Sequence, residues 1–339
     1  MAKKIKIKFQ NGINKEIACR DILNELLDEY IFEESENPDF IFFGPYGNEI
    51  PERGKYIRIG YYCENIKPDM SVCEWAFGIA REEEINNYRY KKIQWHALDP
   101  LTLIKSDAYD AEQIFEQKEN FCAFIYGNKV PYREEFFKQL SRYKKVDAPG
   151  TSMNNMPNNV DILYKGSKWE RKRLFLQKYK FTISFENYVY PGYQTEKLYD
   201  AMLANSIPVY CGDAHVNEVF NTSSFINAAD FINFNSSITA NLLEKYAQPD
   251  FRDIRPSYYR APLDRAKRKL KAVGRQKKMT LQFKNFDFSP VIEKIIELDH
   301  DNNKYIQMLK QPWFNNNTPP LNASLRARWT EIFEQRINE

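Results

Sequence analysis

Segments with the hydrophobic pattern of strands alternate with segments of helical pattern along the first part of the chain. KIKIKF (4–9) alternates polar and apolar positions, which is typical of a half-buried strand, and the apolar runs in PDFIFFGP (38–45) and KYIRIGYY (55–62) are typical of buried strands. Between the first two, DILNELLDEY (21–30) has apolar residues at helical spacing and predicts a helix. Strands that alternate with helices favour a parallel sheet covered by helices on both faces.

The same alternation returns in the second half of the chain. The strand pattern of FCAFIY (121–126) is followed by the amphipathic helix pattern of YREEFFKQLSRY (132–143), and further strands are predicted at FTISF (181–185) and IPVYC (207–211). The sequence therefore predicts a second α/β half with its own parallel sheet.

The length of the chain favours more than one domain. Its 339 residues exceed the roughly 250 to 300 at which single hydrophobic cores stop growing. The polar stretch 111–120 separates the two α/β patterns. We therefore predict an α/β domain of residues 1–117, an α/β domain of residues 118–300, and a C-terminal helical segment of residues 301–339 that packs back on the first domain.

The composition is that of a folded globular protein. Hydrophobic residues make up 43% and charged residues 28%, without a Pro-rich or Gly/Ser-rich tract. The N-terminal MAKKIKIKFQNG lacks the apolar stretch of a signal peptide, and no segment approaches the ~18 to 20 apolar residues that span a bilayer. The five cysteines are scattered and form no CxxC pair, which predicts neither a disulfide framework nor a zinc site. Together these features predict a cytoplasmic protein.

Positive charge is concentrated in one segment. Residues 251–278 contain eleven Lys and Arg against two Asp, a balance of +9, whereas the whole chain has a net charge of +3. Such segregation is typical of a solvated helix face and also of a surface that meets phosphates or anionic lipid. We predict a weak peripheral contact of 251–278 with an anionic membrane, which would hold the protein at the inner membrane.

The richest segment for chemistry is 178–213. FTISF reads as a buried strand, ENYVYPGYQ as a loop, TEKLYDAMLA as a helix and IPVYC as the next strand, which makes one βαβ unit. Thr195 is a suitable N-cap, so Glu196 and Lys197 fall in the first helical turn, beside backbone N–H groups that bind phosphate oxygens. In this position Glu196 can accept ribose hydroxyls and Lys197 can neutralise a departing diphosphate. Spacing alone favours a simpler interpretation, in which Glu196 complements the helix dipole and Lys197 is a solvated charge, because Thr-Glu-Lys is common at helix starts.

The order of several motifs resembles the α1,3-fucosyltransferases, glycosyltransferase family 10, in their microbial form. The resemblance rests on four blocks that follow one another in the family's order: YYCENIKPDMSVCEWAFGI (61–79), FCAFIYGNKVPYREEFFKQL (121–140), KYKFTISFENYVYPGYQTEKLYDAMLANSIPVYCGD (178–213) and VFNTSSFINAADF (219–231). Two positions depart from the family pattern, since Gln194 stands where Val is usual and Cys211 where Trp is usual.

The resemblance implies a GT-B fold, in which two Rossmann-like domains face each other across a cleft. It also implies an inverting transferase that moves L-fucose from GDP-fucose to a hydroxyl of an N-acetyllactosamine-type oligosaccharide or glycolipid acceptor, namely the 3-hydroxyl of GlcNAc. The second domain would hold the donor, and the first domain the acceptor. No divalent metal would be essential, because side-chain cations take its role.

The resemblance also assigns roles to individual residues. Glu196 would bind the ribose or fucose hydroxyls, and Lys197 and Arg133 would neutralise the diphosphate. On position alone, Arg133 fits a surface arginine equally well. The remaining donor-binding residues would be Asn128, Asn187 and Tyr193.

The general base is expected on the acceptor side, because inversion requires attack from the face opposite GDP. The candidate is Glu64, which follows the strand KYIRIGYY and lies in the block that resembles the family's catalytic E-N-x-x-P-D. Asp69 and Glu74 are alternatives. Burial against Tyr61, Tyr62 and a bound sugar would raise the pKa of Glu64 towards neutrality.

Three other functions are open at this stage. A GT-B enzyme with another nucleotide sugar and a non-catalytic glycan-binding protein share many of these features. A metal-dependent transferase with a D-x-D motif would have to use Asp299-His300-Asp301, which fits a polar helix end better. Nucleic-acid binding is not expected, because the basic residues of 251–278 are not interleaved with regular aromatic platforms.

Overall fold

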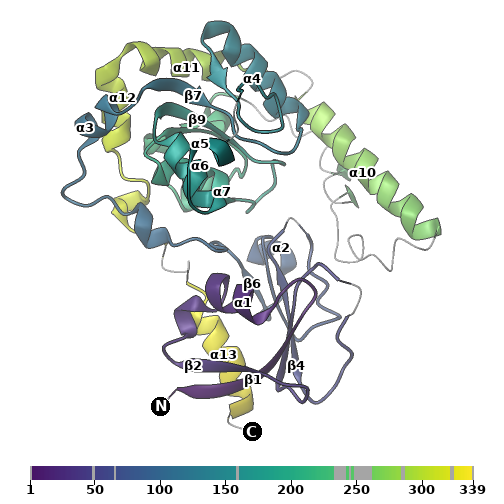
Figure 1. The fold of residues 1–339 in the computed structure, drawn as a ribbon. Coiled ribbons are helices and arrows are strands. Elements are labelled where there is room, and N and C mark those ends of the chain that lie inside the picture. The colour runs from purple at the N-terminus through teal and green to yellow at the C-terminus, as the bar shows by residue number, and fades with distance from the viewer. Residues whose placement is uncertain are drawn as a thin grey trace. The chain divides into compact units, whose positions relative to one another are not determined.

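The computed structural model describes residues 2–47, 50–64, 66–157, 160–232, 242–243, 246–247, 262–283, 287–320 and 324–337. The chain divides into two compact units (Figure 1). The first comprises the described parts of 1–98, 237–278 and 321–339, and the second those of 99–236 and 279–320.

The first unit is built on a parallel six-stranded sheet in the order β2-β1-β3-β4-β5-β6. Its strands are β1 (Lys3–Gln10), β2 (Tyr30–Glu34), β3 (Phe40–Phe43), β4 (Ile57–Tyr62), β5 (Trp75–Gly78) and β6 (Tyr90–Lys92). Within residues 2–98 and 324–337 the helices are α1 (Lys15–Asp21), α2 (Glu82–Ile85), α13 (Arg326–Ile337) and the 3₁₀ turn η1 (Asn24–Leu26).

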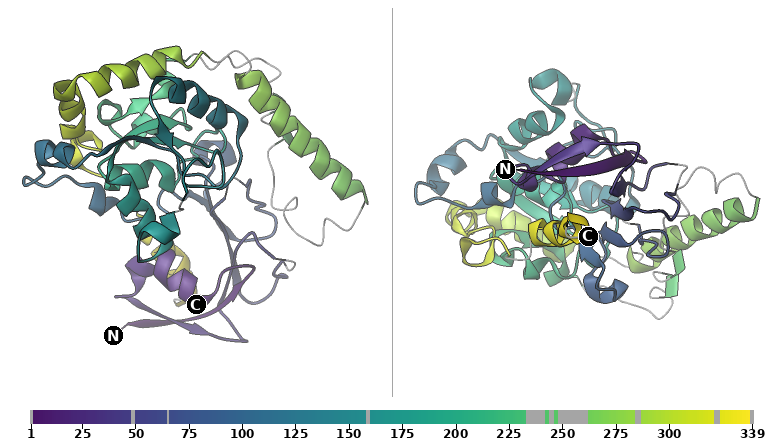
Figure 2. Two further views of the ribbon diagram at one scale, coloured as in Figure 1. Left: turned by 45° about the horizontal axis from the view of Figure 1, so that its top comes forward. Right: turned by 90° about the horizontal axis from the view of Figure 1, so that it is seen from below.

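Alternation along the strands gives the first sheet a separate core on each face. Tyr61 belongs to the core that includes α13, and Tyr62 belongs to the core on the other face. Trp329 of α13 stacks on Phe77 with ring centroids 4.0 Å apart, and Phe333 packs edge-on against Phe40. The yellow α13 accordingly lies against the purple strands in both figures (Figures 1 and 2).

The second unit contains a parallel five-stranded sheet in the order β11-β10-β9-β7-β8. Its strands are β7 (Asn120–Ala123), β8 (Val146–Asp147), β9 (Tyr179–Phe185), β10 (Ile207–Cys211) and β11 (Ile226–Asn227). The helices are α3 (Ala111–Glu116), α4 (Pro131–Tyr143), α5 (Val160–Leu163), α6 (Lys168–Leu176), α7 (Glu196–Leu203), α11 (Ser289–His300) and α12 (Asn302–Lys310). Short 3₁₀ turns are η2 (Pro100–Leu103), η3 (Val216–Glu218), η4 (Thr222–Ser224), η5 (Ala228–Asp230) and η7 (Asn315–Asn317).

The central strand β9 directs alternate side chains to opposite faces of this sheet. Phe185 packs against Phe136 of α4 and Phe288 beside α11, with ring centroids 4.7 and 6.3 Å away. Ser184, one residue earlier, donates to the backbone oxygen of Lys197 in α7. The alternation therefore directs Glu186, which directly follows β9, to the α7 side.

The strand order of the second sheet reverses between β7 and β9. The chain passes from β7 outward to β8, returns to β9 on the other side of β7, and continues to β10 and β11. Open parallel sheets bind ligands at such a switch point, outside the carboxyl ends of the strands. The loops that leave β7 and β9 here lead to α4 and α7, which carry most of the residues predicted to bind the donor.

The predicted strands and the helices at 132–143 and 195–204 are confirmed, and the helix predicted at 21–30 is wrong. There α1 ends at Asp21, and η1 buries Leu23 and Leu26 before β2 begins at Tyr30. The apolar residues Leu23 and Leu26 are spaced as in a helix, but a single 3₁₀ turn is enough to bury both of them.

The division of the chain differs from the predicted boundaries. The second unit begins at Asp99 and not near residue 118, because Thr102 contacts Tyr199 and Phe115 packs against Tyr305. The segment 301–339 is also divided, since α12 belongs to the second unit and α13 to the first.

Helix α10 (Pro262–Phe283) contains the described part of the basic segment. Residues 251–261, which complete the predicted 251–278 stretch, lie outside the described residues. Among the described residues, no helix has the length and apolar character needed to cross a membrane.

Candidate functional site

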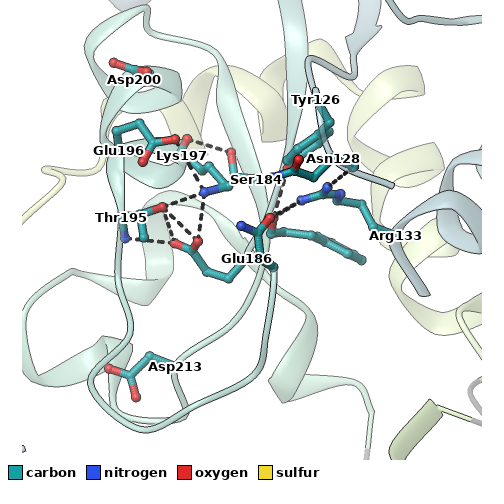
Figure 3. Close-up of polar contacts among 12 residues, drawn as sticks. Tyr126, Asn128, Arg133, Ser184, Glu186, Thr195, Glu196, Lys197, Asp200 and Asp213 are labelled. Carbon is teal, nitrogen blue, oxygen red and sulfur yellow. Dashed lines mark hydrogen bonds and ion pairs between the residues drawn. The ribbon is translucent and has the colours of Figure 1, made fainter. Parts of the chain in front are cut away.

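Arg133 is a buried cation at the switch point of the second sheet. It lies in the first turn of α4, after Pro131, and has no exposed surface. Its guanidinium donates to the side-chain oxygen of Asn187 (3.0 Å) and to the backbone oxygen of Asn128 (2.6 Å), and lies 3.5 Å from the ring centroid of Tyr126. Figure 3 shows Arg133 beside Tyr126 and Asn128.

The charge of Arg133 has no anionic partner in the described part of the chain. Its guanidinium forms no ion pair there, and its Nε has no hydrogen-bond partner. A buried cation is costly unless it is paired, and the Tyr126 ring offsets only about 2 kcal/mol of that cost. The site is therefore suited to an anionic ligand.

A second cation, Lys197, lies at the start of α7 within a network of oxygen atoms. Its Nζ is 2.9 Å from Thr195 Oγ1, 3.2 Å from Glu186 Oε2 and 3.4 Å from Glu196 Oε1. Figure 3 shows Glu186 and Lys197 pointing toward each other. Burial opposes the charged form of Lys197, but the two carboxylates outweigh it and raise the lysine pKa above its usual range. Lys197 therefore remains charged at neutral pH.

Glu196 is the more accessible of the two carboxylates. Its side chain is 32% exposed, whereas that of Glu186 has no exposed surface. Burial acts to raise the pKa of Glu196, but Lys197 and Lys172 outweigh it and hold this pKa below its usual range. Glu196 is thus an ionised acceptor that a ligand hydroxyl can reach.

Thr195 occupies the predicted N-cap position, but its side chain does not cap the helix. It makes no hydrogen bond to a backbone N–H of α7. Its hydroxyl and its backbone N–H instead donate to Glu186, at 2.8 to 2.9 Å. The Thr195 side chain therefore does not occupy the N–H groups of the first turn.

The remaining predicted donor residues lie in the loops around this network. Asn187 directly follows Glu186 and is partly exposed, Tyr193 is buried near Lys197, and Asn128 is exposed in the β7–α4 loop. The structure thus brings Arg133 together with Asn128 and Asn187, and Lys197 together with Glu196 and Tyr193.

The two departures from the family pattern have local structural roles. Gln194 donates to the carboxylate of Asp213 (2.7 Å) and so ties the loop before α7 to the end of β10. Cys211 is buried in β10, and its backbone oxygen accepts from Glu186 N–H. A Cβ on the next residue, Gly212, would lie 2.7 Å from Glu186 Cγ, so this close approach requires glycine.

Glu64 lies in the first unit, just after β4, and is exposed. No described residue donates to its carboxylate. Tyr61 and Tyr62 are fully buried in cores on opposite faces of the sheet. The expectation that these two rings bury Glu64 is therefore wrong: alternation along β4 turns them away from a common pocket.

The alternatives to Glu64 are engaged in local contacts. Glu74 forms a two-pronged ion pair with the buried Arg58, at 2.6 and 3.0 Å. Burial acts to raise the pKa of Glu74, but the Arg58 hydrogen bonds lower it below its usual range. Asp69 accepts from the backbone N–H and the hydroxyl of Ser71 in a turn. Glu74 is therefore a poor proton acceptor.

The Asp299-His300-Asp301 triplet is a helix junction. Asp301 caps α12 by accepting from Lys304 N–H, and Asp299 pairs with Lys144 and Lys180, both at 2.9 Å. Within the described residues, no group of three or more His, Cys, Asp and Glu side chains could hold a metal ion. The five cysteines are all free thiols.

Two parallel Rossmann-like sheets, one with the buried Arg133 and the partly buried Lys197 near its switch point, define an α/β protein with a candidate phosphate site. The chain belongs to glycosyltransferase family 10, the fucosyltransferases. Residues 115–248 match the family model described as "Glycosyltransferase family 10 (fucosyltransferase) C-term", and residues 7–95 match the "Alpha-(1,3)-fucosyltransferase FucT N-terminal domain". The family resemblance inferred from the sequence motifs is therefore confirmed.

Named relatives match parts of the chain. It is 28% identical to the alpha-(1,3)-fucosyltransferase FucT of Helicobacter pylori over 237 residues, which are 60% of this chain and 48% of the relative. It is 37% identical to the putative fucosyltransferase R654 of Acanthamoeba polyphaga mimivirus over 123 residues, which are 34% of this chain and 20% of the relative. The matches thus span about half or less of these relatives' length.

Solved structures share the fold. A crystal structure of an alpha1,3-fucosyltransferase superimposes with a TM-score of 0.65 at 20% identity, covering 98% of this chain and 91% of the other. A second structure, titled as an alpha1,3-fucosyltransferase with GDP-fucose, superimposes with a TM-score of 0.64 and the same coverage of both chains. The predicted GT-B fold class is confirmed.

Sequence reasoning missed Glu186. It lies inside the quoted FEN motif, directly after five residues that were read as a buried strand. A carboxylate at the carboxyl end of a buried parallel strand is the available signal, because ligands and their polar networks gather there.

Proposed function

We propose that this chain is an inverting α1,3-fucosyltransferase, which moves L-fucose from GDP-fucose to the 3-hydroxyl of GlcNAc in an N-acetyllactosamine-type oligosaccharide or glycolipid. The observation that carries the proposal is the buried charge of Arg133 at the switch point of the second sheet, which has no anionic partner among the described residues. A nucleoside diphosphate would supply an anion that the described side chains around Arg133 do not provide. Membership of the fucosyltransferase family selects GDP-fucose among nucleotide sugars.

The donor would be held by residues with complementary chemistry. The Arg133 guanidinium and the Lys197 ammonium would bind the diphosphate and stabilise the charge that GDP carries as it leaves. The exposed edge of Glu196 would accept from ribose or fucose hydroxyls. Asn128, Asn187 and Tyr193 would line the same pocket.

Proton removal from the acceptor would fall to Glu64. Its carboxylate is exposed, whereas Glu74 is held by Arg58. An acceptor hydroxyl that attacks the anomeric carbon loses its proton as the new bond forms, and an accessible carboxylate can take it. The proton passes to Glu64, the C–O bond to GDP breaks, and the configuration at the anomeric carbon inverts.

The proposed reaction needs no divalent metal or other cofactor. In D-x-D transferases a metal ion neutralises the diphosphate. Here Arg133 and Lys197 would supply two positive charges for the same purpose.

The decisive experiment combines the chain with GDP-fucose and a panel of N-acetyllactosamine-type acceptors. GDP release that depends on acceptor, with a fucosylated product of inverted configuration, is the expected result. Glycan binding without GDP release would support a non-catalytic glycan-binding protein. Turnover of a different nucleotide sugar, with GDP-fucose inert, would identify another donor.

A second proposal concerns α10 as a contact with an anionic membrane. Its 22 residues include eight Lys and Arg, and they also carry exposed apolar side chains. Leu263, Leu270 and Val273 are 84%, 72% and 49% exposed, and with Leu281 they fall within one side of the helix at 100° per residue. An apolar stripe flanked by cations is the composition of helices that lie in a membrane interface. This contact would hold a cytoplasmic protein at the inner membrane.

Co-sedimentation with liposomes tests this second proposal. Binding to vesicles rich in phosphatidylglycerol but not to neutral phosphatidylcholine is expected, and the double change Leu263→Ser and Leu270→Ser should abolish it. Leu101→Ser, at an apolar side chain 63% exposed in η2, is the matched control. Equal binding to neutral and anionic vesicles contradicts the proposal.

A further inference from the structure

Glu186 is a fully buried carboxylate in direct contact with the start of α7. Three donors converge on it: the backbone N–H of Thr195 (2.8 Å), the hydroxyl of Thr195 (2.8 and 2.9 Å) and the ammonium of Lys197 (3.2 Å). Its own backbone is held as well, since its N–H donates to Cys211 and its carbonyl accepts from the Tyr132 hydroxyl. Glu186 therefore has little freedom to move.

This contact determines what Thr195 does. A threonine at an N-cap ordinarily accepts from a backbone N–H of its own helix. Here the hydroxyl points its proton at Glu186 and accepts from Lys197 (2.9 Å). Glu186 thus keeps the Thr195 side chain away from the helix start, where phosphate oxygens bind.

The two carboxylates around Lys197 are not equivalent. Glu196 makes the longer contact, at 3.4 Å, and is partly exposed, so an incoming diphosphate can replace it. Glu186 makes the shorter contact, has no exposed surface and is also bound to Thr195. A ligand that draws Lys197 toward its phosphates therefore frees Glu196 for hydroxyls, while Glu186 keeps its place.

We propose that Glu186 is a positioning residue of the donor site. It holds the Lys197 ammonium and turns the Thr195 side chain away from the first turn of α7, so that both the cation and the helix N–H groups meet the diphosphate. The inference rests on the proposed GDP-fucose donor. It assigns Glu186 no contact with the substrate itself.

The test measures GDP binding by calorimetry from pH 7 to 10.5 in the wild type and in Glu186→Gln. The groups whose charge acts on Lys197 are Glu186, Glu196, Tyr193 and Tyr126. Removing the Glu186 charge lowers the lysine pKa. The alkaline midpoint, which is the pH at which GDP affinity has fallen by half, should therefore lie above this range in the wild type and move into it in Glu186→Gln. At pH 7 the variant should bind GDP about tenfold to a hundredfold more weakly.

Two further variants separate positioning from folding. Asp200→Asn removes another fully buried carboxylate of α7, which pairs with Lys172 and Arg173, and it should leave the alkaline midpoint unchanged. Glu186→Asp keeps the charge, so its alkaline midpoint should lie close to that of the wild type. If Glu186→Gln does not fold, Thr195→Val removes the shared hydroxyl and should weaken GDP binding by about tenfold.

The outcomes distinguish this inference from the function on which it rests. A wild-type chain that does not bind GDP contradicts the donor assignment. A wild-type chain that binds GDP, with Glu186→Gln showing the same affinity and the same alkaline midpoint, contradicts the role of Glu186 alone.

Discussion

The guanidinium of Arg133 lies over the ring of Tyr126, 3.5 Å from its centroid. The Tyr126 hydroxyl donates to the backbone oxygens of Ile183 and Phe185 in β9, at 2.7 and 3.1 Å, which fixes the ring. The ring in turn fixes the plane of the guanidinium. Arg133 is therefore oriented by β9 before any ligand arrives.

This stacking predicts that lysine cannot replace Arg133. Arg133→Lys keeps the charge but loses the planar contact and the fork of donors. We expect Arg133→Lys and Arg133→Ala each to lower kcat/KM for GDP-fucose. The loss should correspond to about 2 to 4 kcal/mol of transition-state stabilisation. Arg142→Lys, in the last turn of the same helix, is the control and should be neutral. An unchanged kcat/KM in Arg133→Lys would contradict the claim that stacking on Tyr126 orients the Arg133 guanidinium for the donor.

Much of the fold could be predicted because the local pattern and the tertiary environment agree. The buried run FTISF becomes β9, and α7 begins directly after Thr195, the residue predicted at its N-cap position. The 21–30 segment could not be predicted in this way. Whether Leu23 and Leu26 are buried by a helix or by one 3₁₀ turn depends on where β2 begins, and tertiary pairing decides that.

The acid stability of the second unit should depend on Asp299. Burial acts to raise its pKa, but hydrogen bonds from Lys180, Lys144 and Tyr143 hold the pKa below the ordinary 3.8. A depressed folded-state pKa means that this stabilisation is present above about pH 3.8 and is lost as pH falls through the folded value.

Asp299→Asn should therefore lower the free energy of unfolding by about 1 to 3 kcal/mol at pH 7, with the difference shrinking below pH 3.8. Chemical denaturation at several pH values measures this. Asp107→Asn, at an exposed carboxylate, serves as the control. A difference between wild type and Asp299→Asn that stays constant down to pH 2 is incompatible with the ion network.

The candidate site was only partly accessible from the sequence. The motif order indicated Arg133, Glu196 and Lys197. It did not indicate that the Thr195 hydroxyl donates to Glu186 and makes no hydrogen bond to a backbone N–H of α7. Nor did it indicate that Glu74 is held by Arg58, because that pair joins β4 to the residue before β5. Both facts depend on contacts between neighbouring strands and loops, which periodicity along one segment does not encode.

Chelation should leave activity intact. Because Arg133 and Lys197 provide the positive charge near the diphosphate, fucosyl transfer should persist after exhaustive EDTA treatment and dialysis. GDP release is the measurement, and a D-x-D transferase treated in parallel shows that chelation was effective. Loss of activity with EDTA and its return with manganese would support a metal site.

Replacement of the proposed base should separate chemistry from binding. Glu64→Gln should bind GDP almost as the wild type does while kcat falls by about 10²- to 10⁴-fold. Glu74→Gln is the comparison, and it should chiefly lower thermal stability because it breaks the pair with buried Arg58. Full kcat in Glu64→Gln, with loss in Asp69→Asn, would transfer the role to Asp69.

Calorimetric titration of GDP and guanosine into the wild type and Lys197→Ala tests the central claim most directly, namely that the start of α7 binds the donor's diphosphate. The wild type should bind GDP at least about tenfold more tightly than guanosine, because charge-assisted contacts reach only the phosphates. Lys197→Ala should remove most of this preference and leave guanosine binding unchanged, whereas Lys165→Ala, at an exposed lysine, should match the wild type. A Lys197→Ala protein that binds GDP as tightly as the wild type would contradict the account.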